Sequence, residues 1–250
     1  MQVLASLAGA DTSVRIPDLV DMLGDHPRCE LGIQVMPGRQ DVPRYPPHAW
    51  IMELTRAVAA SPHGLGRISL HLNRGYAHQA LSGSLHGDVV DLAVTGYALA
   101  LGRIQLNLRD DGDTDPGPLA TLIDHLTCPD MSVVIQSKPA NLALLDGLDR
   151  LGCQYQVLHD SSEGRGERPD VWPLPRPGRL NSWAGGITLG SLPHDLEAIH
   201  RIAGGRFGVD LESGLRDPAD PGCFSLELAH GVLEGIRGFV AGALTREQVA

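Results

Sequence analysis

The sequence has few of the features that mark metal, redox or membrane proteins. Its cysteines form no CxxC pair, and its histidines are scattered rather than clustered. Zinc sites normally show such residues in pairs at short spacing, so we expect no metal. We expect free thiols, as is usual in a reducing cytoplasm, and therefore a cytoplasmic location. The four cysteines are Cys29, Cys128, Cys153 and Cys223.

Long apolar runs and an excess of positive charge are also missing. No apolar segment is long enough to span a bilayer, and no basic, apolar and cleavable start is present. The formal net charge is −10, which argues against nucleic acid or a membrane surface as the partner. No motif implies a cofactor, and the expected partner is a small molecule. Both a monomer and a homodimer are compatible with the sequence.

Lysine is almost absent, because Lys138 is the single lysine of the chain. A GC-rich genome that favours arginine would explain this scarcity. A chemical explanation is also open, since a desolvated lysine can lose its proton and act as a base or nucleophile, whereas arginine stays protonated. The position of Lys138 in the fold decides between these interpretations.

The sequence does contain a regular alternation of short apolar runs and longer amphipathic segments. The short runs predict eight strands, at 3–7, 30–35, 68–72, 104–108, 132–136, 155–158, 180–183 and 207–211. The amphipathic segments predict helices at 13–23, 48–60, 88–100, 118–126, 142–151, 193–203 and 224–241. Alternating strands and helices indicate βαβ units and a parallel sheet. A proline-rich stretch after the sixth strand, PDVWPLPRPGRL, is expected to replace or shorten a helix.

Eight such units in one chain of this length predict a single-domain (β/α)8 TIM barrel over residues 1–250. An open, doubly wound sheet is the alternative, but no GxGxxG follows the first strand. In barrels of this kind the chemistry lies in the loops after the strands. Lys138 follows the fifth predicted strand directly, which favours a chemical role for it.

Four motifs stand in the second half of the chain in the order QVLHD, EGRGERPDVW, WAGGI and VDLESGLRD. They resemble LLLD, GGTG…FDW, LAGGL and VDVSSGVE, which occur in the same order in the phosphoribosylanthranilate isomerases of tryptophan biosynthesis. The first half gives weaker matches, such as SLHLN for GVFVN and IQLNL for VQLHG. The resemblance implies a TIM barrel and an Amadori rearrangement, which needs a general acid and a general base.

The resemblance also implies roles for individual residues. Asp160 matches the general acid, and Arg44 matches the arginine that holds the substrate carboxylate. Glycine loops and a helix N-terminus suit a phosphate, and the matching residues are Gly185, Gly186, Ser213 and Gly214. Further substrate-binding positions are expected at Asn107, Gly164, Arg165, Gly166 and Glu212.

Several departures from the family pattern concern the general base. The family cysteine that serves as base is Ala8 here, the preceding lysine is Ser6, and the VQLHG histidine is Asn107. Glu212 replaces a serine and brings negative charge near the expected phosphate, where Arg165 is placed to offset it. A relocated base is one explanation, with Lys138, Asp11 or Glu212 as candidates.

Three functions therefore stay open at this stage. The first is an isomerase-like enzyme that acts on a small phosphorylated or sugar-like metabolite by proton transfer, with Asp160 and Lys138 as catalytic residues. The second is a lyase or aldolase that uses Lys138 as a Schiff-base nucleophile. The third is a barrel without catalysis that binds a ligand or a partner protein.

Overall fold

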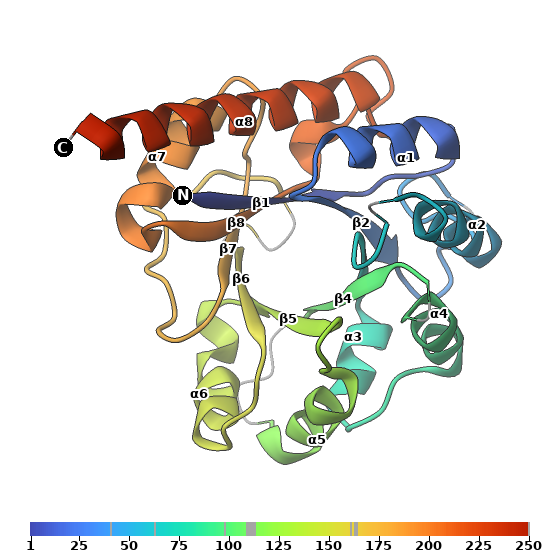
Figure 1. Cartoon of the computed structure of the whole chain (residues 1–250). Coiled ribbons are helices and arrows are strands. Elements are labelled where there is room, and N and C mark those ends of the chain that lie inside the picture. The colour runs from blue at the N-terminus through green and yellow to red at the C-terminus, as the bar shows by residue number, and fades with distance from the viewer. Residues whose placement is uncertain are drawn as a thin grey trace.

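The computed structural model describes residues 1–40, 42–62, 64–97, 99–108, 114–160, 162 and 165–249, without the side chains of 97 and 246–249. Eight parallel strands form a closed barrel in chain order, with β1 paired to both β2 and β8. Figure 1 views this barrel from one end. The strands are β1 (Gln2–Ala8), β2 (Cys29–Val35), β3 (Ile68–Asn73), β4 (Leu101–Asn107), β5 (Ser132–Ser137), β6 (Gln156–Asp160), β7 (Asn181–Ala184) and β8 (Arg206–Leu211). The predicted (β/α)8 barrel is confirmed, and the open sheet was the wrong alternative.

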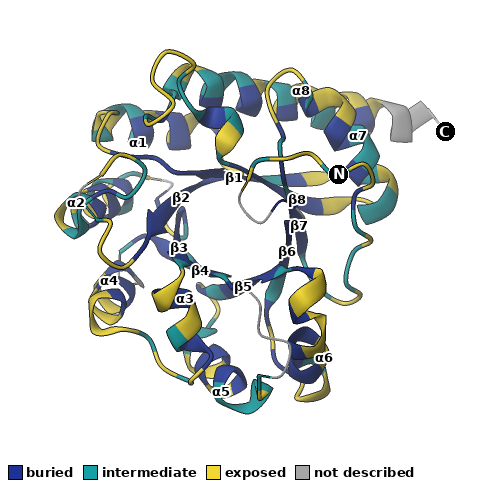
Figure 2. Cartoon of the chain, turned by 180° about the vertical axis from the view of Figure 1, so that it is seen from behind, coloured by how far each residue is buried: buried dark blue, intermediate teal, exposed yellow. Residues whose placement is uncertain are grey.

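The helices surround the barrel and cover its outer face. Figure 2 shows buried residues on their barrel side and exposed residues on their outer side. This pattern follows from the helical spacing of the apolar residues, which places them on one face. The helices are α1 (Ile16–Asp25), α2 (His48–Ala59), α3 (Gly75–Ala80), α4 (Gly87–Tyr97), α5 (Pro116–Leu126), α6 (Leu142–Arg150), α7 (Leu192–Ala203) and α8 (Leu226–Val249).

Two connections differ from a regular βα repeat. The short helix α3 follows β3 and was not predicted, because six residues are too few to reveal a helical period. Between β6 and β7, the described residues 162 and 165–180 contain no helix, as the prolines predicted. Trp183 of β7 donates a hydrogen bond to the Pro173 carbonyl at 2.9 Å, which ties this extended segment to the barrel wall.

The strands separate apolar and polar residues by their two-residue period. Side chains that face the helices form the apolar core, for example Leu31, Ile33 and Val35 of β2. The inner face is polar instead, and it includes a buried ion pair between Glu30 and Arg103 at 3.1 Å. The barrel therefore has a polar interior that leads toward the carboxyl ends of its strands.

Neither a membrane span nor a metal cluster is found in the described part of the chain. No helix there combines the length and the apolar character that crossing a bilayer requires. No three His, Cys, Asp or Glu side chains there group as metal ligands do. All four cysteines are free, as predicted, and Cys29 and Cys153 are buried.

Candidate active site

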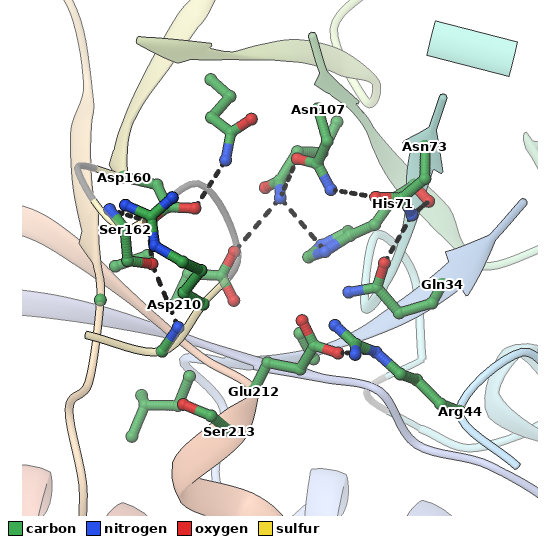
Figure 3. Close-up of a pocket in the computed structure, with 18 of the residues that line it drawn as sticks. Gln34, Arg44, His71, Asn73, Asn107, Asp160, Ser162, Asp210, Glu212 and Ser213 are labelled. Atoms are coloured by element: carbon green, nitrogen blue, oxygen red, sulfur yellow. Dashed lines mark hydrogen bonds and ion pairs between the residues drawn. The ribbon is translucent and has the colours of Figure 1, made fainter. Parts of the chain in front are cut away.

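A cavity of about 790 Å³ opens at the carboxyl ends of the strands. Figure 3 shows that residues from several different strands point into it. Most of the predicted site residues line this cavity, namely Arg44, Asn107, Lys138, Asp160, Arg165, Gly166, Gly185, Gly186, Glu212 and Ser213. Gly214 is not among the described residues that line it, and Gly164 lies outside the described residues. The fold thus brings together residues that lie far apart in the sequence.

Asp160 ends β6 and is held by several hydrogen-bond donors. Its Oδ2 accepts from Gln136 Nε2 at 2.6 Å, and its Oδ1 accepts from the backbone N and the hydroxyl of Ser162 at 3.0 and 2.7 Å. Asp160 is only 6% exposed, so these donors take the place of water around a buried carboxyl. This arrangement fixes the carboxyl group at one position in the cavity.

Lys138 lies at the same end of the barrel, directly after β5. Its backbone N donates to Asn141 Oδ1 at 2.9 Å, and Asn141 Nδ2 donates to the Gln136 carbonyl at 2.7 Å. Asn141 therefore closes the turn after β5 and fixes the backbone of Lys138. The lysine is buried and lines the cavity. The position of this single lysine fits the chemical interpretation of its scarcity.

A ladder of carboxamide side chains crosses the inner wall from β2 to β4. Asn73 Nδ2 donates to Gln34 Oε1 at 2.6 Å and to the His71 carbonyl at 3.0 Å. Asn107 Nδ2 donates to Asn73 Oδ1 at 3.0 Å, and Gln105 Nε2 donates to Asn107 Oδ1 at 3.1 Å. Because a backbone carbonyl can only accept, the His71 carbonyl fixes the direction of every bond in the ladder.

The direction of this ladder also fixes the tautomer of His71. Gln105 Nε2 lies 3.2 Å from His71 Nδ1, so Nδ1 is the acceptor and the ring proton lies on Nε2. Burial, followed by the nearby Arg103 charge, lowers the pKa of His71 to about 3. His71 is thus neutral at physiological pH. Its Nε2 has no hydrogen-bond partner among the described residues.

Asp210 of β8 is the other deep carboxyl group of the cavity. It is buried, and it accepts from Gln105 Nε2 at 3.2 Å. Burial raises its pKa well above the ordinary value, and the Glu212, Glu30 and Asp160 charges raise it further against the opposing effect of the Gln105 bond. Asp210 therefore differs from Asp160 in its surroundings, although both line one cavity.

Glu212 lies between two arginines at the mouth of the cavity. It forms ion pairs with Arg44 and with Arg216, the latter at 3.5 Å. Arg44 has a positive φ of 79°, a conformation that is uncommon for residues other than glycine. The charge of Glu212 is therefore met by this arginine pair and not by Arg165 as we expected, because Arg165 pairs with Glu167 at 3.2 Å.

The predicted phosphate loops pack closely against neighbouring loops. Gly186 has a φ of 60°, and a Cβ there would lie 2.6 Å from the Arg168 backbone N. A Cβ on Gly166 would in turn meet the side chain of Ser213. The backbone N–H groups of Gly186 and Ser213 make no hydrogen bond to another described residue. Glycine at these positions thus permits the close approach of the loops after β6, β7 and β8.

Asp11, one of the three candidate bases, lies apart from the cavity. It is 1% exposed and accepts from Ser13, from the Phe224 backbone N at 3.2 Å, and from Arg216 at 3.3 Å. Ala8 does line the cavity, and no proton acceptor stands on that side chain. Of the three candidates, only Lys138 and Glu212 are cavity-lining residues.

Several polar residues of the cavity were not predicted, because most of them lie within the strands and not directly after a strand. These residues occupy alternate positions within the strands, and their two-residue period was visible in the sequence. The missed residues are Gln34, Gln105, Gln136 and Asp210, together with Ser162 and Arg216 in the loops.

Comparison with known proteins finds similarity in structure alone. No family model matches the sequence, and no curated protein matches it. Phosphoribosyl anthranilate isomerase from Thermotoga maritima superposes with a TM-score of 0.62 at 14% identity, over 95% of this chain and 100% of that one. A phosphoribosyl anthranilate isomerase in complex with reduced 1-(o-carboxyphenylamino)-1-deoxyribulose 5-phosphate gives 0.58 at 13% identity, over 95% and 100%.

A third solved structure shares the barrel architecture, but it is a synthase and not a phosphoribosyl anthranilate isomerase. The 3-hexulose-6-phosphate synthase from Salmonella typhimurium gives a TM-score of 0.54 at 12% identity, over 96% of this chain and 100% of that chain. At these identities the likeness establishes the fold that the chains share. The chain is a TIM barrel of the same architecture as these proteins.

Proposed function

We propose that the protein is an enzyme that isomerises a small phosphorylated or sugar-like metabolite by proton transfer. The reaction would be an aldose–ketose isomerisation of the Amadori type, with Asp160 as a proton-transfer residue. The observation that carries this proposal is the convergence of Asp160, Lys138 and Asp210 on one polar cavity. A general acid and a general base must both reach the substrate, and this cavity offers more than one proton-transfer group.

The lining of the cavity also suits a polyhydroxylated substrate. The carboxamides of Gln34, Asn73, Asn107 and Gln136 can each donate and accept hydrogen bonds, as sugar hydroxyl groups do. Gln136 Oε1 is buried without a hydrogen-bond partner among the described residues. An acceptor of this kind favours a ligand that carries hydroxyl donors.

The opposite side of the cavity supports an anionic end of the substrate. The backbone N–H groups of Gly186 and Ser213 are available hydrogen-bond donors of the type that binds phosphate. A structural neighbour is described in complex with a 5-phosphate ligand. We therefore assign the phosphate to the loops after β7 and β8, next to the Glu212–arginine cluster.

Replacing Glu212 with Gln should raise the affinity for inorganic phosphate by about tenfold, because the change removes a negative charge beside the loop and releases Arg44 from its ion pair. Arg216 keeps its ion pair with Asp11. Isothermal titration of phosphate into wild type and Glu212→Gln measures this effect. Glu227→Gln, an exposed position in α8, is the matched control. Phosphate affinity that is unchanged or lower in Glu212→Gln would contradict the assignment.

Lys138 supports a second candidate function, a lyase or aldolase with a Schiff-base nucleophile. Its burial at the cavity wall favours this chemistry, because desolvation promotes the unprotonated amine that attacks a carbonyl. Borohydride reduction in the presence of aldose phosphates should then leave a mass adduct on Lys138 that is absent from Lys138→Met. The lack of any adduct across a panel of carbonyl substrates would rule against the second function.

A further inference from the structure

The carboxyl group of Asp210 is poorly supplied with hydrogen-bond donors. Gln105 is its one donor among the described residues, and Gln105 Nε2 also faces His71 Nδ1 and Asn107 Oδ1. The direction of the carboxamide ladder forces all three contacts onto this nitrogen, which has only two hydrogens. Asp210 therefore shares a donor with two other acceptors.

The charges around Asp210 disfavour a second carboxylate there. Glu212 lies just after the end of β8, Glu30 is on β2, and Asp160 is on β6, and the charges of all three act on Asp210. The cations nearby are engaged elsewhere, since Arg103 pairs with Glu30 and two arginines pair with Glu212. The same cavity is also lined by the neutral His71 on β3 and by Lys138 after β5. A proton on Asp210 relieves this repulsion.

Asp160 and Asp210 face the cavity from opposite sides of a small residue. Ala184 of β7 pairs in register with both of them, so their backbones are about 10 Å apart, or two strand spacings. The short alanine side chain leaves space between the two carboxyl groups. Two carboxyls with different surroundings around one space form an acid and base pair.

We propose that Asp210 is a second proton-transfer residue of this site, which holds a proton in the ligand-free protein and gives it to a substrate oxygen. This inference rests on the proposed function. It reverses the assignment that the resemblance implies, because Asp160 then takes the proton from carbon as the base. It also explains how the site could work with alanine at position 8.

The proton steps balance without any further reagent. Asp210 protonates the ring oxygen, the C1–O bond breaks, and the nitrogen lone pair forms the C1=N bond of an iminium ion. Asp160 then removes the C2 proton, and the C2–H electron pair forms the C1=C2 bond of an enol as the iminium nitrogen becomes neutral. The proton on Asp160, which lines the open cavity, exchanges with solvent before a proton is delivered to C1. Asp210 recovers a proton from the C2 hydroxyl as the ketone forms. Both aspartates are restored.

Protonation of Asp210 also predicts how stability depends on pH. The folded state holds a proton that the unfolded state loses at about pH 3.9, so stability falls as pH rises from there toward the raised folded pKa. The Asp210→Asn variant has no carboxyl group at this position, so its stability should not fall with pH for this reason. Its free energy of unfolding, relative to wild type, should therefore increase between pH 4 and pH 8. The exposed control Asp91→Asn should show no such trend.

The deciding experiment is a carboxyl NMR titration of aspartate-labelled protein from pH 4 to pH 9. We expect that the resonance missing from Asp210→Asn will keep its protonated shift at pH 7, whereas ionisation by pH 5 would overturn the inference.

Turnover of phosphoribosylanthranilate is measured separately. We expect that Asp210→Asn will lower kcat at least 100-fold, and wild-type turnover in that variant would also overturn the inference. A wild type without turnover on any aldosylamine phosphate would reject the proposed function and the transfer step, while the titration alone decides whether Asp210 is protonated.

Discussion

Replacement of Asp160 with Asn should lower kcat/KM by about 10²- to 10⁴-fold, the usual contribution of a positioned proton-transfer group. Asparagine keeps the size of the side chain and can still accept from Gln136 or Ser162, but it cannot exchange a proton with the substrate. The loss should appear mainly in kcat, because binding groups elsewhere in the cavity are unchanged. Steady-state kinetics with an aldosylamine phosphate measures this effect.

Ser162→Ala provides the matched control for this substitution. It removes one hydrogen bond to Asp160 and leaves the carboxyl group in place, so we expect a smaller loss of kcat than in Asp160→Asn. Circular dichroism and thermal unfolding of both variants separate loss of chemistry from loss of fold. If Asp160→Asn retained the wild-type kcat while folded, Asp160 would have no role in proton transfer.

Substitution of Gly186 with Ala should destabilise the protein by about 2–5 kcal/mol and abolish phosphate binding. Alanine in the left-handed region costs about 1–2 kcal/mol, and a Cβ at 2.6 Å from Arg168 N and 2.8 Å from the Gly166 carbonyl adds about 1–3 kcal/mol of overpacking. The clash would push the loop after β6 away from the loop after β7. Denaturant unfolding and phosphate titration measure the two effects.

Gly178→Ala isolates the contribution of backbone conformation. Gly178 has a φ of 70°, but no atom lies within 4 Å of a Cβ built there. We therefore expect a loss of about 1–2 kcal/mol and unchanged phosphate affinity. Equal destabilisation of Gly178→Ala and Gly186→Ala would show that the packing of the loops contributes nothing.

The barrel could be predicted because each strand and most helices have a clear local pattern. The apolar runs of β2 and β8 are short, and Pro193 is the second residue of α7, in the first turn, where a helix tolerates proline. The positions of helix ends were less certain. The helix α8 continues to Val249, beyond the predicted end at 241, and so passes through Gly242, a residue that often marks the end of a helix. Good helix formers such as Ala243 and Leu244 follow this glycine.

The rim of the site was also predictable, since it consists of the residues that follow each strand. Asp160 and Lys138 were found in this way, and both line the cavity. The interior was not predicted, although Gln105 and Asp210 stand at alternate positions within their strands. The two-residue period separates the two faces of a strand, but only closure of the barrel determines which face lines its interior.

Partner choice among charged residues could not be predicted at all. Sequence resemblance placed Glu212 near a phosphate and Arg165 opposite it, yet the fold brings Arg44 and Arg216 to Glu212. Arg216 also reaches Asp11, which is far away in the sequence. These contacts depend on how the loops after β1, β2 and β8 meet, and no local pattern encodes that arrangement.

The most direct test of an acid–base site is exchange of the substrate C2 proton with solvent. Wild type, Asp160→Asn and Lys138→Met would be incubated in D2O with phosphoribosylanthranilate and with ribose 5-phosphate, and deuterium at C2 or in the product would be measured by mass spectrometry. The proposed function predicts incorporation by wild type that is lost in Asp160→Asn. No incorporation by folded wild type with either substrate, or equal incorporation by Asp160→Asn, would contradict it.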